Sequence, residues 1–374
     1  MDDITRTDPA PATEANGASV SGRSGEADAR SRAVRDTGPS VLSLGQIWVD
    51  IMLDVPAIPQ AGGFAVTRQV TPAIGGSYRV LDAARRMGAR SRHGGIIGTG
   101  FWGTAIRNAL QESGIEHVGQ DRLDADTGFR LVFNDGERKT FIATYGAETQ
   151  GDEETFAELE PDAGDVVHIS GNTLMDHSAA GIDVFLERKG NAPGSRDFTL
   201  VLNPTNSLHL VNDHLLEDTV LARPLWSCNR QEAVTLAERL GVDTRNDAAM
   251  TVGGGFDESM AGLCEALGSV LHAPIVLRAG SRGAWVREAN AAHALHIPGY
   301  PTKPVHTRSA GSCHTGALCA MLAEGRSLQE ATRLANAAAS LAIDHSVSGV
   351  PQCPDPTQAQ ALADSSGDMP DERR

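Results

Sequence analysis

Residues 304–322, PVHTRSAGSCHTGALCAML, place a group of small residues directly before an apolar run that fits a buried helix. The first backbone N–H groups of a helix have no partner inside the helix, so they can bind an anion such as phosphate. The stretch contains no Asp or Glu that could act as a general base. It therefore predicts an anion-binding helix start without the carboxylate that proton transfer would need.

Asn229 and Glu232 lie three positions apart at the start of a helical pattern, in WSCNRQEA. Residues i and i+3 share one helix face, so these two oxygen-bearing side chains could together hold the waters of a magnesium ion. The same pair fits a second interpretation, in which Asn229 caps the helix and Glu232 completes a capping box. The spacing alone leaves both interpretations open.

Residues 98–103, GTGFWG, match the G-x-G-x-x-G pattern of dinucleotide-binding turns and precede a helical segment, with Asp121 further along the chain. Taken alone, the pattern would indicate a dinucleotide-dependent oxidoreductase. The first buried strand, however, is followed by QIWVDIMLDVP and not by a glycine loop. Glycines also occur where a strand turns tightly into a helix, so the oxidoreductase is a distant alternative.

One aspartate and two further pairs of glycines stand where buried strands are expected to end. Asp50 lies near the end of the first strand, where open α/β sheets place ligand-binding groups. Gly75 and Gly76 precede a helical pattern, and Gly280 and Gly283 follow the buried strand APIVLRAG. The glycines could let the backbone approach a ligand, and they fit an ordinary turn equally well. Asp50 could bind a ligand, and it fits a loop cap equally well.

Patterns of buried strands alternate with helical patterns along most of the chain. The apolar runs VLSLG, DVVHIS, FTLVLN and APIVLRAG are separated by helical segments such as SYRVLDAARRMGA. This predicts an α/β protein whose mostly parallel sheet is covered by helices on both faces. Two segments interrupt the alternation, GGFAVTRQVTPAIGG and TGFRLVFNDGERKTFIATYG, the second with a hairpin signal at Asn134-Asp135-Gly136. They predict a small separate β-sheet.

The composition is that of a soluble globular protein. The 374 residues are 40% apolar, and 48 acidic against 32 basic residues give a net charge of −16. Such an acidic chain is not expected to bind nucleic acid or an anionic membrane. Five widely spaced cysteines without a C-x-x-C pair indicate reduced thiols and a cytoplasmic protein. No apolar run is long enough to predict a membrane-spanning helix, and the N-terminal residues lack the apolar core that a signal peptide would have.

The two ends of the chain differ from its middle. Residues 1–39 are rich in Ala, Ser, Gly, Asp, Arg and Pro and have no hydrophobic period, which predicts a disordered tail. Residues 363–374 predict a second tail for the same reason. Residues 40–362 are expected to form one folded domain.

In this order, the motifs resemble those of the ribokinase-like (PfkB-type) family of sugar and nucleoside kinases, over roughly residues 40–360. The resemblance is carried by Asp50, the glycine pair at 75, GTGFWGTAIRNALQESGIEH, the N-x-x-E of CNRQEA, VLRAGSRGAW, the small residues from 309, and ANAAAS around Asn336. It implies a doubly wound α/β domain with a β-sheet lid at about residues 55–75 and 127–146, and a homodimer formed through the lid. It also implies that GTGFWG is scaffold and not a nucleotide site.

The resemblance implies ATP and Mg²⁺ as cofactors and a sugar or nucleoside as the substrate. It places the anion hole at Ser309, Ala310 and Gly311, and the position of the family's catalytic Asp at Ser312. The remaining implied positions are Asp50, Gly75, Gly76 and Val80 for the substrate, Asn229, Arg278, Gly280, Gly283 and Asn336 for the nucleotide, and Glu232 for the magnesium ion through water.

Three positions depart from the family pattern. Ser312 replaces the Asp that takes the proton from the sugar hydroxyl, and Val80 replaces an Asn that binds sugar hydroxyls. His306 replaces an Asp of a monovalent-cation site, which puts that cation in doubt. A positioned base contributes about 10²- to 10⁴-fold in rate and each anion-hole donor about 10²- to 10³-fold. Two hypotheses follow. The first is a working kinase with a rearranged base, for which His306 is a better candidate than His314, because residues i and i+2 of a helix, such as Ser312 and His314, do not face each other. The second is a non-catalytic protein that binds nucleotide or sugar.

Overall fold

The computed structural model describes residues 38–205, 208–243, 255–303, 309–344, 346–347 and 350–365. These described residues belong to one compact unit. The tail expected at residues 1–39 lies outside the described residues up to residue 37, and the tail expected at the C-terminus lies outside them from residue 366. No helix among the described residues is long and apolar enough to cross a membrane.

The main sheet has nine strands, in the order β15-β14-β13-β12-β11-β10-β1-β4-β6. The strands from β6 to β13 pair in parallel, and β14 and β15 add an antiparallel edge. Their bounds are β1 Ser40–Ser43, β4 Arg90–His93, β6 Glu116–His117, β10 Val166–Ser170, β11 Thr199–Asn203, β12 Leu225–Asn229, β13 Ile275–Arg278, β14 Gly283–Arg287 and β15 Leu295–Pro298. This confirms the expected mostly parallel sheet.

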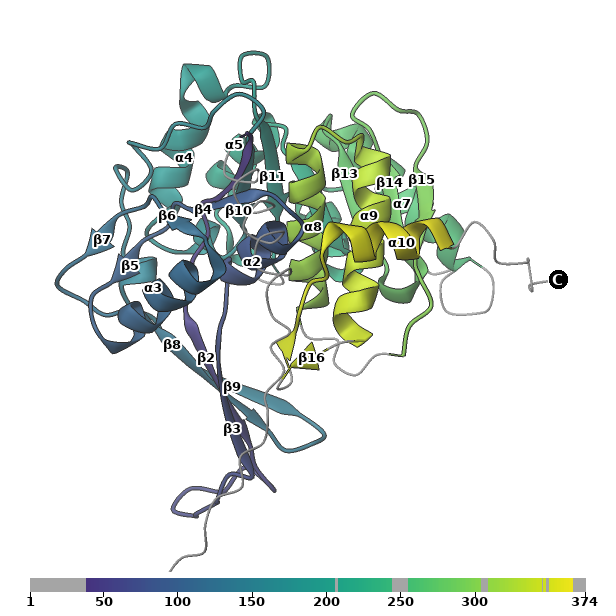
Figure 1. The fold of residues 1–374 in the computed structure, drawn as a ribbon. Coiled ribbons are helices and arrows are strands. Elements are labelled where there is room, and N and C mark those ends of the chain that lie inside the picture. Colours follow the sequence, from purple (N-terminus) through teal and green to yellow (C-terminus); the bar gives the residue numbers. More distant parts are fainter. Residues whose placement is uncertain are drawn as a thin grey trace, which may run out of the picture. The chain divides into compact units, whose positions relative to one another are not determined.

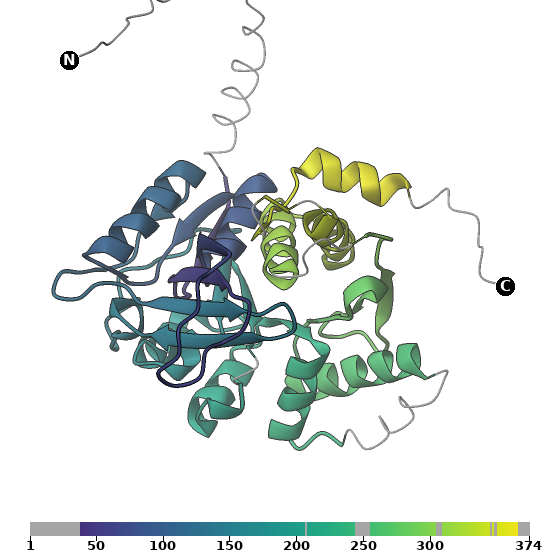
Figure 2. The same ribbon diagram turned by 90° about the horizontal axis from the view of Figure 1, so that it is seen from below.

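Helices cover both faces of this sheet (Figures 1 and 2). One face is covered by α2 Tyr78–Arg86, α3 Phe101–Ser113, α8 Ala310–Ala323, α9 Leu328–Asp344 and α10 Pro356–Ser365, and the other by α4 Ala179–Glu187, α5 Asp213–Leu221, α6 Arg230–Arg239 and α7 Phe256–Leu271. Two separate hydrophobic cores result. The strands explain this arrangement, because neighbouring side chains of a strand point to opposite faces: Val276 belongs to the first core, whereas Ile275 and Leu277 belong to the second.

A second sheet of four strands, which we call the lid, extends below the main sheet in Figure 1. Its order is β3-β2-β8-β9, with bounds β2 Val49–Asp54, β3 Gln69–Ile74, β8 Phe129–Asn134 and β9 Lys139–Thr144. The hairpin expected at Asn134-Asp135-Gly136 joins β8 and β9, where Gly136 has a φ of 94° and the Asp135 carboxylate accepts two backbone N–H groups. Two small ladders pair β5 Ile97–Gly98 with β7 Asp121–Arg122, and β16 Ser346–Val347 with β17 Val350–Pro351.

Two expectations about the start of the domain need correction. The first strand ends at Ser43, so Asp50 does not stand at its end. Asp50 lies inside β2, a lid strand paired on both sides, with β3 and with β8. The lid therefore includes residues 49–54, ahead of the segment expected from residue 55. The sequence QIWVDIMLDVP did not show that the chain passes from the main sheet to the lid here, because its alternating apolar residues fit a strand of either sheet.

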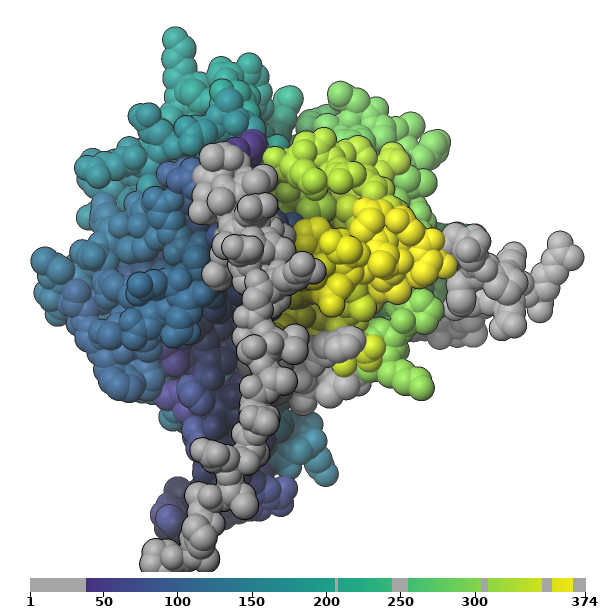
Figure 3. Space-filling model, viewed as in Figure 1, coloured from purple at the N-terminus to yellow at the C-terminus, as the bar shows by residue number. Residues whose placement is uncertain are grey.

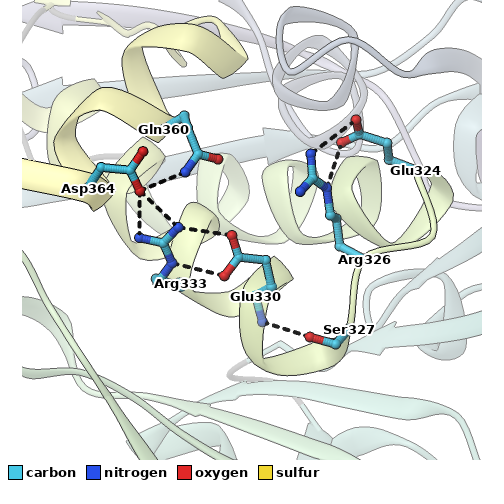
Figure 4. Close-up of polar contacts among 7 residues, drawn as sticks. All are labelled: Glu324, Arg326, Ser327, Glu330, Arg333, Gln360 and Asp364. Carbon is cyan, nitrogen blue, oxygen red and sulfur yellow. Dashed lines mark hydrogen bonds and ion pairs between the residues drawn. The ribbon is translucent and has the colours of Figure 1, made fainter.

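The last helix, α10, is part of the folded domain. It continues to Ser365, beyond the boundary expected at residue 362, and Ala359 and Ala363 are buried in the first core. Arg333 of α9 forms two hydrogen bonds of 2.9 Å with Glu330 and also contacts Asp364 at the end of α10 (Figure 4). In the space-filling view, α10 (yellow) is exposed on this face of the molecule (Figure 3).

The five cysteines are all free and buried. Burial raises the pKa of the Cys264 and Cys319 thiols to about 12, so both stay protonated at neutral pH. They behave as small apolar core residues, which agrees with the reduced thiols expected from their spacing.

Candidate active site

The start of α8 opens into a cavity of about 240 Å³, which we call the inner cavity. Ser309, at the N-cap, has a φ of 65°, and the Cys313 N–H makes the first hydrogen bond of the helix, to the Ser309 carbonyl. The N–H groups of Ala310, Gly311 and Ser312 therefore lie ahead of the helical ladder, as in an anion-binding helix start. Ser309 and Ser312 both line the inner cavity.

Asp50 lies in the wall of the same cavity and is 1% exposed. Its Oδ1 accepts hydrogen bonds from Trp48 Nε1 at 3.0 Å and from Arg130 Nε at 2.8 Å. Its Oδ2 accepts from Arg79 Nη2 at 2.9 Å and from Arg130 Nη2 at 3.2 Å. Four donors on two oxygens fill the ordinary accepting capacity of a carboxylate. Arg79 also donates to Ser309 Oγ, so it links Asp50 to the start of α8.

Gly75 and Gly76 allow Trp48 to lie against the turn that follows β3. A Cβ at Gly75 would lie 2.7 Å from Trp48 Nε1, and a Cβ at Gly76 would lie 2.2 Å from the Gln46 carbonyl oxygen. Gly76 also has a φ of 65°, which side chains other than glycine rarely adopt. The pair is therefore needed for close approach of the backbone, and Gly76 and Val80 both line the inner cavity.

The opposite wall of the inner cavity comes from the ends of β10 and β11. It includes His168, Ser170, Asn172 and Asn203. The His168 Nδ1 lies 2.9 Å from Ser43 Oγ, and burial lowers the pKa of His168 to about 4, so its ring is neutral at pH 7. Within the described part of the chain, neither His168 Nε2 nor the buried Ser77 Oγ has a hydrogen-bond partner.

Asn229 and Glu232 form the capping box of α6. The Asn229 side chain accepts from the Glu232 N–H at 2.9 Å, and the Glu232 carboxylate accepts from the Asn229 N–H at 2.8 Å. Arg278 contacts the same Glu232 oxygen at 3.3 Å. Burial raises the pKa of Glu232, while Arg278 and the Asn229 N–H oppose that rise. The capping interpretation is therefore realised, and a role in magnesium binding stays a prediction.

Arg278 connects this pair to the start of α8. A Cβ at Gly311 would lie 2.6 Å from Arg278 Nη1, so the guanidinium group packs directly against the first turn of the helix. Arg278 Nη2 also donates to the Ser227 carbonyl at 3.3 Å. Among the described residues, its buried Nε has no hydrogen-bond partner. The predicted nucleotide residue Arg278 thus lies beside the predicted anion hole.

Gly280 and Gly283 form the turn between the antiparallel strands β13 and β14. Both have positive φ, 59° and 91°, and a Cβ at Gly283 would lie 2.2 Å from the Ile297 carbonyl oxygen. A Cβ at Gly280 would meet nothing within 4 Å. The ordinary hairpin considered for these glycines is therefore present, Gly280 lies exposed on it, and the expected role of both glycines in nucleotide binding stays a prediction.

Asn336 is buried behind α8, and its side chain is engaged inside the fold. Its Nδ2 donates to the carbonyls of Ile297 and Pro298, and its Oδ1 lies 3.0 Å from His314 Nε2. Burial and nearby Arg278 lower the pKa of His314 to about 3, so the ring is neutral. Asn336 therefore holds α9 against β15 and α8, and its expected role in nucleotide binding stays a prediction.

The glycine-rich turn at residues 98–103 holds a side chain of the protein itself. The Asp126 carboxylate accepts the N–H groups of Trp102 and Gly103 at 3.0 and 2.8 Å. A Cβ at Gly100 would lie 2.4 Å from Asp126, so this glycine is needed for the contact. Asp121, the candidate ribose-binding acid, pairs with Arg107 of α3. The start of α3 is thus occupied by the carboxylate of Asp126, which fits scaffold and not a pyrophosphate site.

Among the described residues, the site has no evident general base that could take a proton from an acceptor hydroxyl. Position 312 carries a hydroxyl, and the carboxylate of Asp50 already accepts four hydrogen bonds. His314, on α8, is buried and its Nε2 contacts Asn336 Oδ1, which agrees with the expectation that it does not face Ser312. His306, the other candidate base, lies outside the described residues.

A second cavity, the outer cavity of about 440 Å³, shares Trp48, Arg130 and Asn172 with the inner one. Burial raises the pKa of Asp176, in its wall, to about 7, although a hydrogen bond from Gln46 opposes the rise. Glu148, also in its wall, accepts the N–H groups of Gly128 and Gly146.

The residues missed from the sequence are Arg79 and Arg130. Arg79 directly precedes Val80 in GGSYRV, and Arg130 lies in the lid segment TGFRLVFN. A possible signal was an arginine on each of two segments already expected to flank a ligand. Nothing in their spacing along the chain showed that both would reach Asp50.

Comparisons with known proteins identify the family of this chain. The model of the pfkB family carbohydrate kinases matches residues 39–354. An uncharacterised sugar kinase of Escherichia coli strain K12, YegV, is 30% identical over 312 residues, which cover 83% of this chain and 90% of the relative. Ribokinase of Bacillus subtilis strain 168 is 23% identical over 309 residues, 81% of this chain and 92% of the relative.

Solved structures show the same fold. The ribokinase of Cryptococcus neoformans var. grubii serotype A, in complex with ADP, has a TM-score of 0.70 at 17% identity, covering 87% of this chain and 99% of that chain. A Burkholderia thailandensis nucleoside kinase in complex with inosine has a TM-score of 0.66 at 16% identity, covering 88% of this chain and 100% of that chain. With its ribokinase-like fold and a family match over most of its length, the chain belongs to the pfkB family of carbohydrate kinases.

Proposed function

We propose that this protein binds ATP with Mg²⁺ and transfers a phosphoryl group to a sugar or nucleoside in the inner cavity, without a carboxylate base at position 312. The observation that carries the proposal is the start of α8. Its leading N–H groups lie between Arg278 on one side and the cavity lined by Ser309 and Ser312 on the other.

The residues around the start of α8 fit a nucleotide's phosphates. Arg278 has a buried Nε without a hydrogen-bond partner among the described residues, and it packs against Gly311. A guanidinium group beside leading helix N–H groups favours a phosphate oxygen. The open space at Gly280 lies on the turn that follows Arg278 in the chain. ADP is bound to the Cryptococcus relative, which supports the same class of ligand here.

The fit to magnesium rests on Glu232. Its carboxylate is buried near Arg278, and one of its oxygens already accepts from Asn229 and Arg278. A carboxylate that reaches the ion through water suits Mg²⁺, which keeps several of its waters. The ion would supply charge neutralisation of the phosphates, and Glu232 would orient its waters.

Residues of the chain would then act on the transfer in different ways. The N–H groups of Ala310, Gly311 and Ser312 would stabilise the charge on the transferring group, each worth about 10²- to 10³-fold in rate. Because Ser312 is too weakly basic to take a hydroxyl proton, about 10²- to 10⁴-fold of the usual rate is missing. We therefore expect slow transfer.

A second candidate function is that of a non-catalytic protein that binds nucleotide or sugar. It is favoured by the same serine and by Val80, whose apolar side chain stands where a hydroxyl-binding amide would be. The two candidates differ in turnover and not in binding.

Calorimetry with ATP and Mg²⁺, together with an ADP-release assay on a panel of sugars and nucleosides, separates these functions. Binding with measurable turnover supports the kinase, and binding without turnover supports the non-catalytic protein. Failure to bind ATP with Mg²⁺ would contradict the kinase, and failure to bind ATP, every sugar and every nucleoside of the panel would contradict the non-catalytic binding protein as well.

A further inference from the structure

His168 of β10 points toward the helices that enclose the inner cavity. Its neighbours along the strand, Val167 and Ile169, belong to the second core. Neighbouring side chains of a strand point to opposite faces of the sheet. His168 therefore points to the other face, where α2 and α8 pack against each other (Figure 1), and it lines the inner cavity.

The contacts of Ser43 fix which nitrogen of the His168 ring carries the proton. His168 Nδ1 lies 2.9 Å from Ser43 Oγ, and the same Oγ accepts the Gly45 N–H at 3.3 Å. Within the residues that the structure describes, the Ser43 hydroxyl has no acceptor other than Nδ1. It therefore donates to Nδ1, and Nε2 carries the proton. Because burial lowers the pKa of His168 to about 4, the ring is neutral at pH 7 and holds that one proton.

His168 Nε2 is thus a buried donor without an acceptor. The residue is 1% exposed, and its Nε2 has no hydrogen-bond partner in the described part of the chain. A buried polar group that is left unpaired destabilises the folded state, so most such groups in native proteins have a partner. His168 lines the cavity where the acceptor would bind, so a ligand oxygen is the partner that this position can offer.

Ser77, directly ahead of α2, also lines the inner cavity. Its Oγ is buried, does not cap α2 and has no hydrogen-bond partner among the described residues. A Cβ at Gly45 would overlap this Oγ and would lie 2.9 Å from the Cβ of Ser170, another residue of the cavity wall. Gly45 therefore allows both serines to approach the same point of the backbone. A hydroxyl can donate and accept, so Ser77 suits a ligand hydroxyl.

These two groups accompany an apolar residue at the position where the family pattern has a hydroxyl-binding Asn. Val80 lines the same cavity, three positions after Ser77 at the start of α2. Its side chain can make no hydrogen bond. Recognition of a hydroxyl in this cavity therefore needs donors and acceptors from other positions.

From these contacts we propose that His168 and Ser77 determine which acceptor binds, by hydrogen bonding to its oxygen atoms in the inner cavity. His168 Nε2 donates to one oxygen, and Ser77 exchanges a hydrogen bond with a hydroxyl. Together they supply the recognition that Val80 does not give. The inference rests on the proposed function for the statement that the bound molecule is an acceptor.

The test measures binding by calorimetry on the full chain. The probes are D-ribose, D-fructose, D-glucose, adenosine and inosine, followed by the monodeoxy analogues of the probe that binds most tightly. Each analogue lacks one hydroxyl of its parent. The analogue without the oxygen that His168 contacts should bind the unaltered chain about tenfold more weakly than the parent.

His168→Met removes the donor and keeps an unbranched side chain. It should weaken binding of the parent about tenfold and bind the parent and that analogue equally, because the two changes remove the same contact. His168→Gln, which keeps an N–H donor, should lose less affinity.

Ser77→Ala should weaken binding of the parent about fivefold. Because Ser77 Oγ has no partner among the described residues, the free energy of unfolding of the ligand-free protein should not fall. Ser40→Ala is the matched control. Ser40 Oγ is also buried and unpartnered in the described part of the chain, but Ser40 begins β1 and does not line the inner cavity. Ser77→Ala carries the test if His168→Met does not fold.

Unchanged affinities in His168→Met and Ser77→Ala would overturn the inference, and so would a failure of every probe to bind. An equal loss of affinity in Ser40→Ala would also overturn it, because the loss would then not depend on the cavity. Weaker binding in the two cavity variants of a chain that transfers no phosphoryl group would refute the proposed kinase activity and support this inference. Phosphoryl transfer with unchanged affinity in both variants would support the activity and refute the inference.

Discussion

Position 312 determines what the first turn of α8 can do. Its N–H group belongs to the anion-binding helix start whatever side chain is present, because the backbone supplies it. The side chain faces the inner cavity, where the acceptor would lie. Binding of phosphate and removal of a proton are therefore separable at this residue.

We predict that Ser312→Asp raises the phosphorylation rate. The change restores a carboxylate at a helix start, where negative charge is tolerated. The gain should stay well below the roughly 10²- to 10⁴-fold that a positioned base supplies at best, since Val80 still stands where the family pattern has a hydroxyl-binding Asn. The assay is ADP release with the preferred acceptor, and Ser312→Ala is the control for loss of the hydroxyl.

Adding Val80→Asn to Ser312→Asp should raise the rate further. A gain that exceeds the product of the separate effects would show that both positions act on one substrate. Fast turnover of the unaltered chain that survives Ser312→Ala would contradict this account and require a base elsewhere.

Glu232 makes a separate prediction, because it combines a cap with a proposed magnesium contact. Glu232→Gln keeps a side chain able to complete the capping box. We expect a loss of about 1 kcal/mol or less in the free energy of unfolding, from the weakened contact with Arg278. ATP affinity in the presence of Mg²⁺ should fall about tenfold. Asn229→Ser, which preserves a cap, is the matched variant, and calorimetry with and without Mg²⁺ separates the effects.

At the scale of elements, α10 is held to the domain by one apolar face and one charged link. Ala359 and Ala363 are buried, and Arg333 joins Glu330 of α9 to Asp364 of α10 (Figure 4). Hydrogen bonding to Arg333 lowers the pKa of Glu330. Arg326 and Glu324 form a neighbouring pair that stays within the loop between α8 and α9.

We predict that Arg333→Gln loosens α10. The expected loss in unfolding free energy is about 0.2–1 kcal/mol, as for other partly exposed ion pairs. Faster amide hydrogen exchange should be confined to residues 356–365. Arg326→Gln, which breaks a pair that joins no second helix, should leave that exchange unchanged. Unchanged exchange in Arg333→Gln would show that the apolar face alone holds α10.

At the scale of the whole molecule, the free energy of unfolding should depend on pH through two buried groups, His168 and Asp176, whose pKa values are shifted in opposite directions. The pKa of His168 is lowered to about 4 by burial. The unfolded chain therefore binds a proton at this residue that the folded chain does not, and stability is lost as the pH falls from about 6.5 to 4. The pKa of Asp176 is raised to about 7, so its contribution to stability falls as the pH rises from about 4 to 7.

Two variants isolate these contributions. Relative to the unaltered chain, His168→Gln should become more stable as the pH falls from 6.5 to 4, and Asp176→Asn as the pH rises from 4 to 7. Each slope should approach about 1.4 kcal/mol per pH unit. Urea unfolding across this range measures both, and parallel curves for variant and unaltered chain would contradict the assigned pKa shifts.

The lid gives a prediction about assembly. All six residues of β9 are exposed, and the exposed fractions of Phe141 and Ile142 are 51% and 55%. β9 also forms one edge of the lid sheet. An exposed apolar strand at a sheet edge favours association, so we expect a homodimer through the lid. Sedimentation should show a dimer that Ile142→Lys dissociates, and a monomer at micromolar concentration would refute this.

Much of the fold followed from the sequence because its signals are local. Alternating strand and helix patterns predicted the parallel sheet, and Asn134-Asp135-Gly136 predicted the lid hairpin. The small residues at 309–312 predicted the anion-binding helix start, since backbone N–H groups do not depend on distant partners.

The charge state of the inner cavity was decided only by the tertiary structure. Asp50, Arg79 and Arg130 come from three separate segments, and their contacts arise only when the lid strands pair with one another and Arg79 of α2 turns toward them. Hydrogen bonds and burial depend on distances between such segments, which the spacing of residues along the chain does not specify. For that reason the sequence pointed to Asp50 as a ligand group without showing that two arginines contact its carboxylate, and its role in substrate binding stays a prediction.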